Sequence, residues 1–253
     1  MAELDRGLLA AHHEWLESDG KKGRRLVLPG ADLRGACLAT LTLSRADLSG
    51  ADLSGADLNC AELYNTRLVQ ANLSGADLFY ARLADADLSG ANLSGADLSK
   101  ADFSPSRLVG AVLRGAQCLK TEFGETDLTG ADMSRTYLVG TFFYCTILDG
   151  VDFTEADVCL SLGGKRFDVS RVTGMTGAIG SDANLVTVVG DGPERQITIA
   201  ELVEILNRRG AQVTTWPKGH SPDWPPWRWG HSGFPFVTRG KLQTEPQAES
   251  PGP

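Results

Sequence analysis

Long apolar runs are missing from this sequence. Nowhere do eighteen apolar residues follow one another, and the first stretch, MAELDRGLLAAHHEWLES, carries acids and histidines among its apolar positions. A membrane-spanning helix needs about 20 predominantly apolar residues, and a signal peptide needs an uninterrupted apolar stretch. We therefore expect neither a membrane span nor a signal peptide, and we expect a cytoplasmic protein.

Cysteines and catalytic motifs are scarce as well. The five cysteines form an odd set without any CxxC spacing, which argues against a disulfide framework and against a zinc site. GxSxG, Walker A, HExxH and dinucleotide-binding motifs are absent, and the four histidines lie only near the two ends of the chain. We therefore expect no enzymatic activity, no cofactor and no metal site.

One unit of five residues, in contrast, recurs through more than half of the chain. Starting at Leu28, every fifth residue as far as Val158 is apolar or a thiol, which gives 27 consecutive centres without an insertion. Two residues before the centre the side chain is small in most repeats, with alanine in 17 of them and threonine in six. These repeats define a block that covers residues 26–160.

The five-residue spacing excludes both a helix and a flat strand. Five residues advance a helix by about 500°, so successive leucines would share no face. In a strand, side chains alternate with period two, so an odd step moves each leucine to the opposite surface. The leucines share one interior only if the chain turns once per pentad and piles up in coils about 4.8 Å apart. We therefore predict an all-β solenoid.

The phenylalanines indicate how many pentads make one coil. Phe103, Phe123 and Phe143 lie twenty residues apart. A coil of four pentads places these three rings in one internal column, whereas a coil of three pentads aligns no pair of them. We therefore predict four sides, with these rings as a ladder in the core.

The uninterrupted pattern A(D/N)LxG resembles the pentapeptide-repeat family over about 135 of the 253 residues. The resemblance implies a right-handed quadrilateral β-helix with the central Leu or Phe and the preceding Ala inside. It implies no shared enzymatic activity. Family members include bacterial proteins that protect or inhibit DNA gyrase by resembling duplex DNA in shape and charge, beside many others without an assigned role.

The first 25 residues favour a short helical cap on the repeat block. Leu8, Leu9, Trp15 and Leu16 recur at helical spacing, and an open first coil needs a cover over its unpaired edge. The basic cluster KKGRR follows, but five acids balance the five basic residues of this segment. We therefore expect no direct binding of nucleic acid.

The segments after the repeat block have different compositions. Residues 161–192 keep no pentad and are predicted to form an irregular connector, residues 193–237 a helix and a Trp/Pro-rich segment, and residues 238–253 a disordered tail. Thr198 and Glu201 match a helix-capping box. The Trp/Pro-rich segment suits either a recognition surface or packing against the coil.

The helix predicted in residues 193–237 carries an apolar stripe with two interpretations. By the family resemblance it forms a homodimer, and by packing alone it covers the last coil. The residues of this stripe are Ile199, Leu202, Val203, Ile205 and Leu206.

Charge is the main functional signal of the block. Residues 26–160 hold 18 acids against nine bases, a net charge of −9. Sorted by a period of twenty, the residues just before the centres form four outward columns. One alternates in sign through Asp47, Arg67 and Asp87, which we expect to satisfy itself, and two others are acidic without evident local partners. The candidate partner-binding residues on these two columns are Asp32, Asp52, Asp57, Asp77, Asp97, Asp132, Asp152 and Asp157.

Two functions fit these acidic columns. In the first, they imitate the phosphate rows of duplex DNA and bind the DNA channel of a type II topoisomerase, either DNA gyrase or topoisomerase IV. In the second, Asp and Asn before the centre only support turns and solubility. The protein is then a general scaffold or docking protein, with the Trp/Pro-rich segment as its contact surface.

Overall fold

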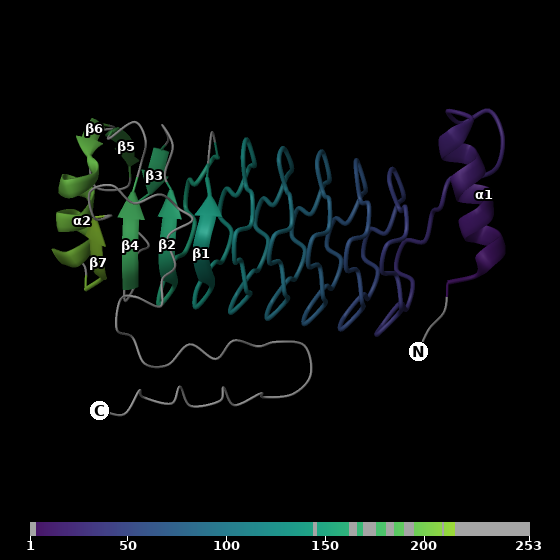
Figure 1. Ribbon diagram of the computed structural model, residues 1–253, viewed down its shortest axis with the longest axis horizontal. Helices are drawn as coiled ribbons and strands as arrows, with labels where there is room; N and C mark the ends of the chain where they lie inside the picture. Colours follow the sequence, from purple (N-terminus) through teal and green to yellow (C-terminus); the bar gives the residue numbers. More distant parts are fainter. Residues whose placement is uncertain are drawn as a thin grey trace, which may run out of the picture.

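The protein is a rod of stacked coils with a helix at each end (Figure 1). The computed structural model describes residues 4–143, 146–161, 166–168, 176–180, 185–189, 195–208 and 210–215. The helices are α1 (Arg6–Glu17) and α2 (Ile199–Arg208), and the strands are β1 (Tyr137–Phe142), β2 (Asp157–Ser161), β3 (Arg166–Asp168), β4 (Thr176–Gly180), β5 (Leu185–Val189), β6 (Arg195–Thr198) and β7 (Gln212–Thr215). Within the described residues, no helix has the length and apolar character needed to cross a bilayer.

Hydrogen bonds between coils join residues about twenty apart. Parallel bridges connect Asp57 to Asp77 and Asp77 to Asp97, and the same step recurs from Val27 to Asp152. The Leu58 N–H donates to the Asp77 carbonyl at 2.7 Å. Because twenty residues contain four pentads, four pentads complete one coil, which is the period that the phenylalanine column indicates.

The interior is filled by the pentad centres and the small residues two positions before them. Every centre from Leu33 to Phe153 is buried. The Phe123 ring stacks between those of Phe103 and Phe143, with centroid separations of 5.2 and 5.4 Å. Single-pair bridges rather than long strands hold most coils together, since the chain bends at every pentad.

Threonines at the small interior positions are buried with their hydroxyl groups satisfied. Thr126 Oγ1 donates to the Phe103 carbonyl at 2.8 Å, and Thr121 Oγ1 donates to the Leu98 carbonyl at 2.8 Å. A buried hydroxyl without such a bond would cost free energy. The coil therefore accepts threonine in place of alanine where a carbonyl of the preceding coil lies within reach.

Helix α1 covers the first coil. Its N-cap residue Asp5 accepts the N–H groups of Gly7 and Leu8 at 2.6 and 3.1 Å. The chain then turns back closely, because the Arg24 N–H donates to the Ala11 carbonyl at 2.8 Å. A Cβ on Gly23 would lie 2.2 Å from the same carbonyl oxygen, so only glycine permits this approach.

At the other end the coil continues beyond the last pentad. Strands β1, β2, β4 and β7 form one parallel sheet in that order, and β3, β5 and β6 form a second sheet. Asp157 of β2 pairs with Thr176 of β4, which pairs with Gln212 of β7. The prediction of an irregular connector over 161–192 therefore missed strands β3, β4 and β5. The Trp/Pro-rich stretch and the expected tail lie outside the described residues.

Candidate functional site

The outward residues of the coil form four ladders. Because each bridge pairs a residue with the one twenty positions later, the side chains just before the centres stack in rows along the rod. Ladder A contains Val27, Asp47, Arg67, Asp87, Arg107, Asp127 and Ile147; ladder B contains Asp32, Asp52, Asn72, Asn92, Val112, Asp132 and Asp152; ladder C contains Cys37, Asp57, Asp77, Asp97, Gln117, Tyr137 and Asp157; ladder D contains Thr42, Glu62, Arg82, Asp102, Glu122 and Phe142.

Ladder carboxylates support the turn that follows them. Oδ1 of Asp57, Asp77 and Asp97 accepts the backbone N–H two residues later, at 3.1, 2.9 and 2.9 Å. The candidates Asp132 and Asp152 do the same at 2.9 Å each. The interpretation that these residues support turns therefore holds for one carboxylate oxygen, and the negative charge of the group remains on the side of the rod.

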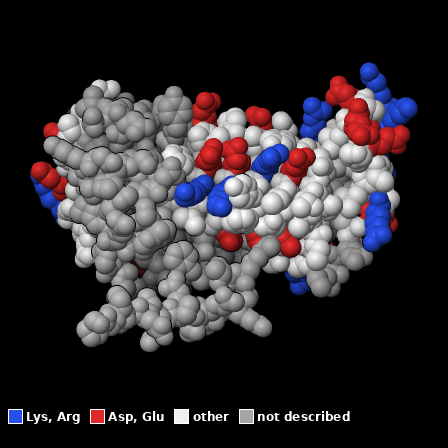
Figure 2. Space-filling view, viewed as in Figure 1, with Lys and Arg blue, Asp and Glu red and all other residues white. Residues whose placement is uncertain are grey.

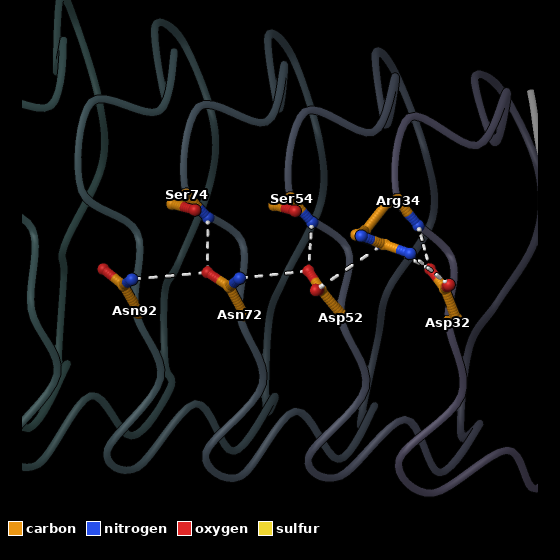
Figure 3. A network of polar contacts seen from close by, with 7 residues as sticks. All are labelled: Asp32, Arg34, Asp52, Ser54, Asn72, Ser74 and Asn92. Atoms are coloured by element: carbon orange, nitrogen blue, oxygen red, sulfur yellow. Dashed lines mark hydrogen bonds and ion pairs between the residues drawn. The ribbon is translucent and has the colours of Figure 1, made fainter.

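Ladder B is a connected polar network at its N-terminal end, as Figure 3 shows. Arg34 donates to both carboxylate oxygens of Asp32, at 2.8 and 2.7 Å, and its Nε lies 3.9 Å from Asp52 Oδ2. The Asn72 amide donates to Asp52 at 3.0 Å, and the Asn92 amide donates to Asn72 at 3.3 Å. The prediction that the acidic columns lack local partners is therefore wrong for Asp32 and Asp52.

The same network shifts the acidity of the two aspartates. The hydrogen bond from the Arg34 side chain is the largest cause that lowers the pKa of Asp32 to about 2. For Asp52 the hydrogen bond from the Ser54 side chain is the largest cause that lowers the pKa, and Arg34 and Asn72 lower it by smaller amounts. Both groups stay ionised at neutral pH, but Arg34 neutralises much of their field.

In ladder A we expected the alternating aspartates and arginines to pair with one another, and the structure differs from this expectation. Along this ladder, which is described from end to end, no arginine lies within ion-pair distance of an aspartate. Instead, Oδ1 of Asp47 accepts the Ser49 hydroxyl at 2.6 Å, and this bond is the largest cause of its lowered pKa. Arg67 adds a weaker effect of the same sign. The hydroxyl groups of Ser49, Ser89 and Thr129, rather than the arginines, hold the carboxylates of this ladder.

Ladder C has the longest unbroken acidic row. Asp57, Asp77 and Asp97 occupy three successive coils and are half-buried, and no basic residue belongs to this ladder. The acidic row ends at Gln117, and ladder C itself continues beyond the repeats through the pairing of Asp157 with Thr176. Of the sequence-predicted site residues, the structure therefore brings these three aspartates together most clearly.

An aromatic corner follows ladder C in the same coils. The Phe79 and Tyr80 rings meet edge to face at 5.1 Å, and Lys100 Nζ lies 5.2 and 4.9 Å from their centroids. Tyr80 is 51% exposed and Leu119, two coils beyond Phe79, is 38% exposed. Sequence reasoning missed this cluster because it treated all corner positions as turn formers.

Two sides of the rod differ in their corner residues. The last corner position has a positive φ, which glycine adopts without strain and which costs other residues about 1 kcal/mol. Beside ladder B most of these positions are glycine, but on both sides of ladder D none is glycine between residues 40 and 125. The residues with positive φ beside ladder D are Thr40, Arg45, Cys60, Asn65, Tyr80, Asp85, Lys100, Lys120 and Glu125. Ladder D and these residues form what we call the projecting side.

Charges of both signs share the surface of the coils. On the face seen in Figure 2, acidic and basic side chains are interspersed with uncharged residues. In the described part of the chain, no group of three or more His, Cys, Asp or Glu residues is placed to hold a metal ion. Cys118 is buried among the leucines, and burial raises the pKa of its thiol.

The apolar stripe of α2 faces the rest of the chain. Leu202 and Leu206 are fully buried, and Val203 and Ile205 are half-buried against the core. The side chain of Ile199 lies outside the described set. This geometry favours the interpretation of α2 as a cover of the last coil. A dimer through Leu202 and Leu206 would require the helix to give up the contacts that bury these two side chains within its own chain.

The comparisons with known proteins agree with the repeat pattern. A family model described as pentapeptide repeats matches residues 41–75, 76–115 and 106–144 in eight copies. No curated protein matches the chain. A solved pentapeptide repeat protein from the thylakoid lumen of Arabidopsis thaliana is 37% identical over 41% of this chain and 69% of its own length, with a TM-score of 0.37.

Two further solved structures are similar to this chain at lower sequence identity. HetL, a pentapeptide repeat protein involved in heterocyst differentiation regulation from the cyanobacterium Nostoc sp. strain PCC 7120, is 24% identical over 76% of this chain and 100% of its own, with a TM-score of 0.29. QnrB1, a plasmid-mediated fluoroquinolone resistance protein, is 19% identical over 75% of this chain and 90% of its own, with a TM-score of 0.46. With its uninterrupted pentads and the matching family model, this chain belongs to the pentapeptide-repeat family.

Proposed function

We propose that this chain is a non-enzymatic interaction module, a right-handed quadrilateral β-helix whose ladder C imitates a phosphate row of duplex DNA. Its partner is the basic DNA channel of a type II topoisomerase, either DNA gyrase or topoisomerase IV. Binding there modulates the enzyme or protects it by occupying the place of the DNA. The acidic row of Asp57, Asp77 and Asp97 is the observation that carries this proposal.

The spacing of this row is close to that of a nucleic acid strand, although sparser. Bridged coils place one carboxylate every ~4.8 Å, whereas one DNA strand carries one phosphate per ~3.4 Å of axis. A rigid row of like charges attracts a basic channel over several ångströms and accelerates association. Because the coil holds the aspartates in place, little conformational entropy is lost on binding.

The aromatic corner supports the same face as a contact surface. Phe79 and Tyr80 lie one and two residues beyond the centre that follows Asp77, so they border ladder C in the middle of the acidic row. Exposed tyrosines are frequent energetic anchors of protein interfaces, while flanking charges set orientation and rate. Ladder C and this corner therefore combine the two features that a specific protein contact needs.

The proposal is tested by measuring DNA supercoiling by gyrase in the presence of the purified protein. The informative variant combines Asp57→Asn, Asp77→Asn and Asp97→Asn. An asparagine at a ladder position can still accept the turn hydrogen bond, as Asn72 does from the Ser74 N–H at 3.2 Å, so the variant removes only the charge. We expect the wild type to change supercoiling and this variant to lose the effect. The matched control removes three charges from ladder A, by Asp47→Asn, Asp87→Asn and Asp127→Asn, and should retain it. An unchanged supercoiling rate with wild-type protein at micromolar concentration would contradict the proposal.

A general scaffold without a topoisomerase role is the second candidate, and the projecting side favours it. Nine residues with positive φ keep side chains there although glycine would be less strained. Proteins tolerate such strain where side chains serve a function. In this case a partner captured from the native host should be lost with Tyr80→Ala or with removal of residues 216–253, while gyrase remains unaffected by the wild type.

A further inference from the structure

His12 is the one fully buried histidine among the described residues, and it lies between α1 and the first coil. Its Nδ1 accepts the backbone N–H of Leu26 at 3.1 Å. The imidazole also stacks on the Trp15 ring, with centroids 5.9 Å apart and planes inclined by 13°. In later pentads the corresponding N–H bonds to the preceding centre, as Ala46 does to the Leu43 carbonyl at 3.0 Å. His12 therefore takes the place of a preceding pentad for Leu26.

This contact requires a neutral ring. A nitrogen that accepts an N–H has no proton of its own, so the proton of the neutral imidazole resides on Nε2. Among the described residues Nε2 makes no hydrogen bond of normal geometry. Protonation at Nδ1 would turn the ring into a donor that faces the Leu26 N–H, and the bond would be lost.

The charged groups around the ring also oppose its protonation. Burial is the largest cause that lowers the pKa of His12 below its ordinary value of 6.5, and the electrostatic interactions with Arg25 and His13 act in the same direction. The Ser44 carbonyl favours the cation and partly offsets them. Arg25 is held in place because its Nε donates to the Arg45 carbonyl at 2.5 Å, and Arg45 in turn pairs with Asp19 at 3.1 Å.

We propose that His12 makes α1 an acid-released cap of the solenoid. The neutral ring holds α1 on the first coil, and the imidazolium releases it and opens the edge of that coil. Arg24 belongs to the same unit, because its N–H bonds to the Ala11 carbonyl of α1 at 2.8 Å. The device is local, since the backbone bonds between later coils involve no titratable side chain.

The direction of the effect follows from the lowered pKa. The docked state binds the His12 proton more weakly than the released state, so docking is strongest above the ordinary value and weakens as the pH falls below 6.5. Because one proton is involved, the equilibrium for release should increase about tenfold for each pH unit below that value, until the pKa of the docked ring is reached.

The experiment is site-resolved hydrogen exchange of the Leu26 and Arg24 amides at about pH 7.5 and about pH 5.5, corrected for intrinsic exchange rates. We expect more opening at the lower pH, by at most about tenfold for a single proton, and no change at the Leu78 amide deep in the coil. In His12→Asn the side-chain oxygen can replace Nδ1 as acceptor without titrating, so opening should lose its pH dependence. His13→Asn removes one of the smaller causes of the lowered His12 pKa but leaves the bond to Leu26, so opening should keep its pH dependence.

A second measurement covers the case in which His12→Asn weakens the cap at every pH. An NMR titration of the wild type reports the pKa and the tautomer of His12 directly. A pKa below 6.5 with Nδ1 unprotonated at neutral pH supports the proposal. A pKa at or above this value, or opening at Leu26 that does not change with pH, would overturn it.

Discussion

The side chain of Asn207 makes both hydrogen bonds that a neighbouring coil would make to Val213. Its Nδ2 donates to the Val213 carbonyl at 2.9 Å, and its Oδ1 accepts the Val213 N–H at 2.9 Å. Val213 lies on β7, the last strand of the sheet that extends ladder C. An exposed strand edge invites pairing with another chain. The amide of Asn207 therefore closes this end of the solenoid, as His12 closes the other.

Replacement of Asn207 should open that edge. In Asn207→Asp the donor is lost and a carboxylate faces the Val213 carbonyl, and in Asn207→Ala both bonds are lost. We expect a loss of about 1–3 kcal/mol in the local stability of β7, because buried backbone groups are left without partners. Hydrogen exchange at Val213 measures it. The control Arg208→Ala, which removes an exposed pair with Glu204, should leave exchange unchanged.

Exchanges between glycine and other residues at the corners should have opposite effects on the two sides of the rod. Gly75 has φ of +64° and no atom lies within 4 Å of the position that a Cβ would take, so Gly75→Ala adds strain without a clash. We expect a loss of about 1 kcal/mol. Thr40 has φ of +61°, and Thr40→Gly should leave stability unchanged or raise it by less than about 1 kcal/mol. Urea unfolding of both variants measures the difference, and a stabilised Gly75→Ala would contradict the account of the corners.

Replacement of two buried threonines by valine should reduce the stability of the protein by different amounts. The Phe103 carbonyl is bonded by the Thr126 hydroxyl, whereas the Leu98 carbonyl, bonded by Thr121, also accepts the Ala101 N–H at 2.9 Å. Thr126→Val should therefore cost about 1–3 kcal/mol and Thr121→Val clearly less. Thermal unfolding compares them, with the serine variants as controls that keep the hydroxyl. Equal losses would show that the shared carbonyl does not matter.

The ion pair of Arg34 should control the acidity of Asp32. Its carboxylate has a pKa lowered to about 2 from an ordinary value of 3.8, with the Arg34 side chain as the first cause. The pair therefore stabilises the folded protein above pH 3.8, and this contribution is lost as the pH falls from 3.8 towards 2. In Arg34→Ala the pKa should return towards the ordinary value. An NMR titration of the Asp32 carboxyl carbon measures it, with Asp132 as the comparison in the same ladder.

The repetitive interior was accessible from the sequence, because its geometry leaves few choices. Leucines five apart can share an interior only in a turning chain, and the stack of Phe103, Phe123 and Phe143 follows from their spacing of twenty. The members of all four ladders follow from the same spacing. What the side chains do on the surface did not follow, because Arg34 is a corner residue and reaches sideways to Asp32 and Asp52.

The ends of the solenoid were only partly accessible. The sequence indicated helices at both ends. The hydrogen bonds of His12 to Leu26 and of Asn207 to Val213 could not be predicted, because neither residue belongs to a periodic pattern. The strands after the last pentad were missed for a similar reason. Asp157 pairs with Thr176 at a spacing of nineteen residues, and the next strand, β7, begins only at Gln212, so no constant period marks them.

The most direct test of the proposed DNA mimicry is competition with duplex DNA for gyrase. If ladder C occupies the DNA channel, the protein and a short linear duplex should exclude each other from the enzyme. Added duplex should then displace labelled protein from gyrase in an equilibrium binding assay. The unlabelled variant with Asn in place of Asp57, Asp77 and Asp97 should displace the labelled wild type poorly. A stable ternary complex of enzyme, duplex and protein would contradict the mimicry, as would the absence of any binding by the wild type.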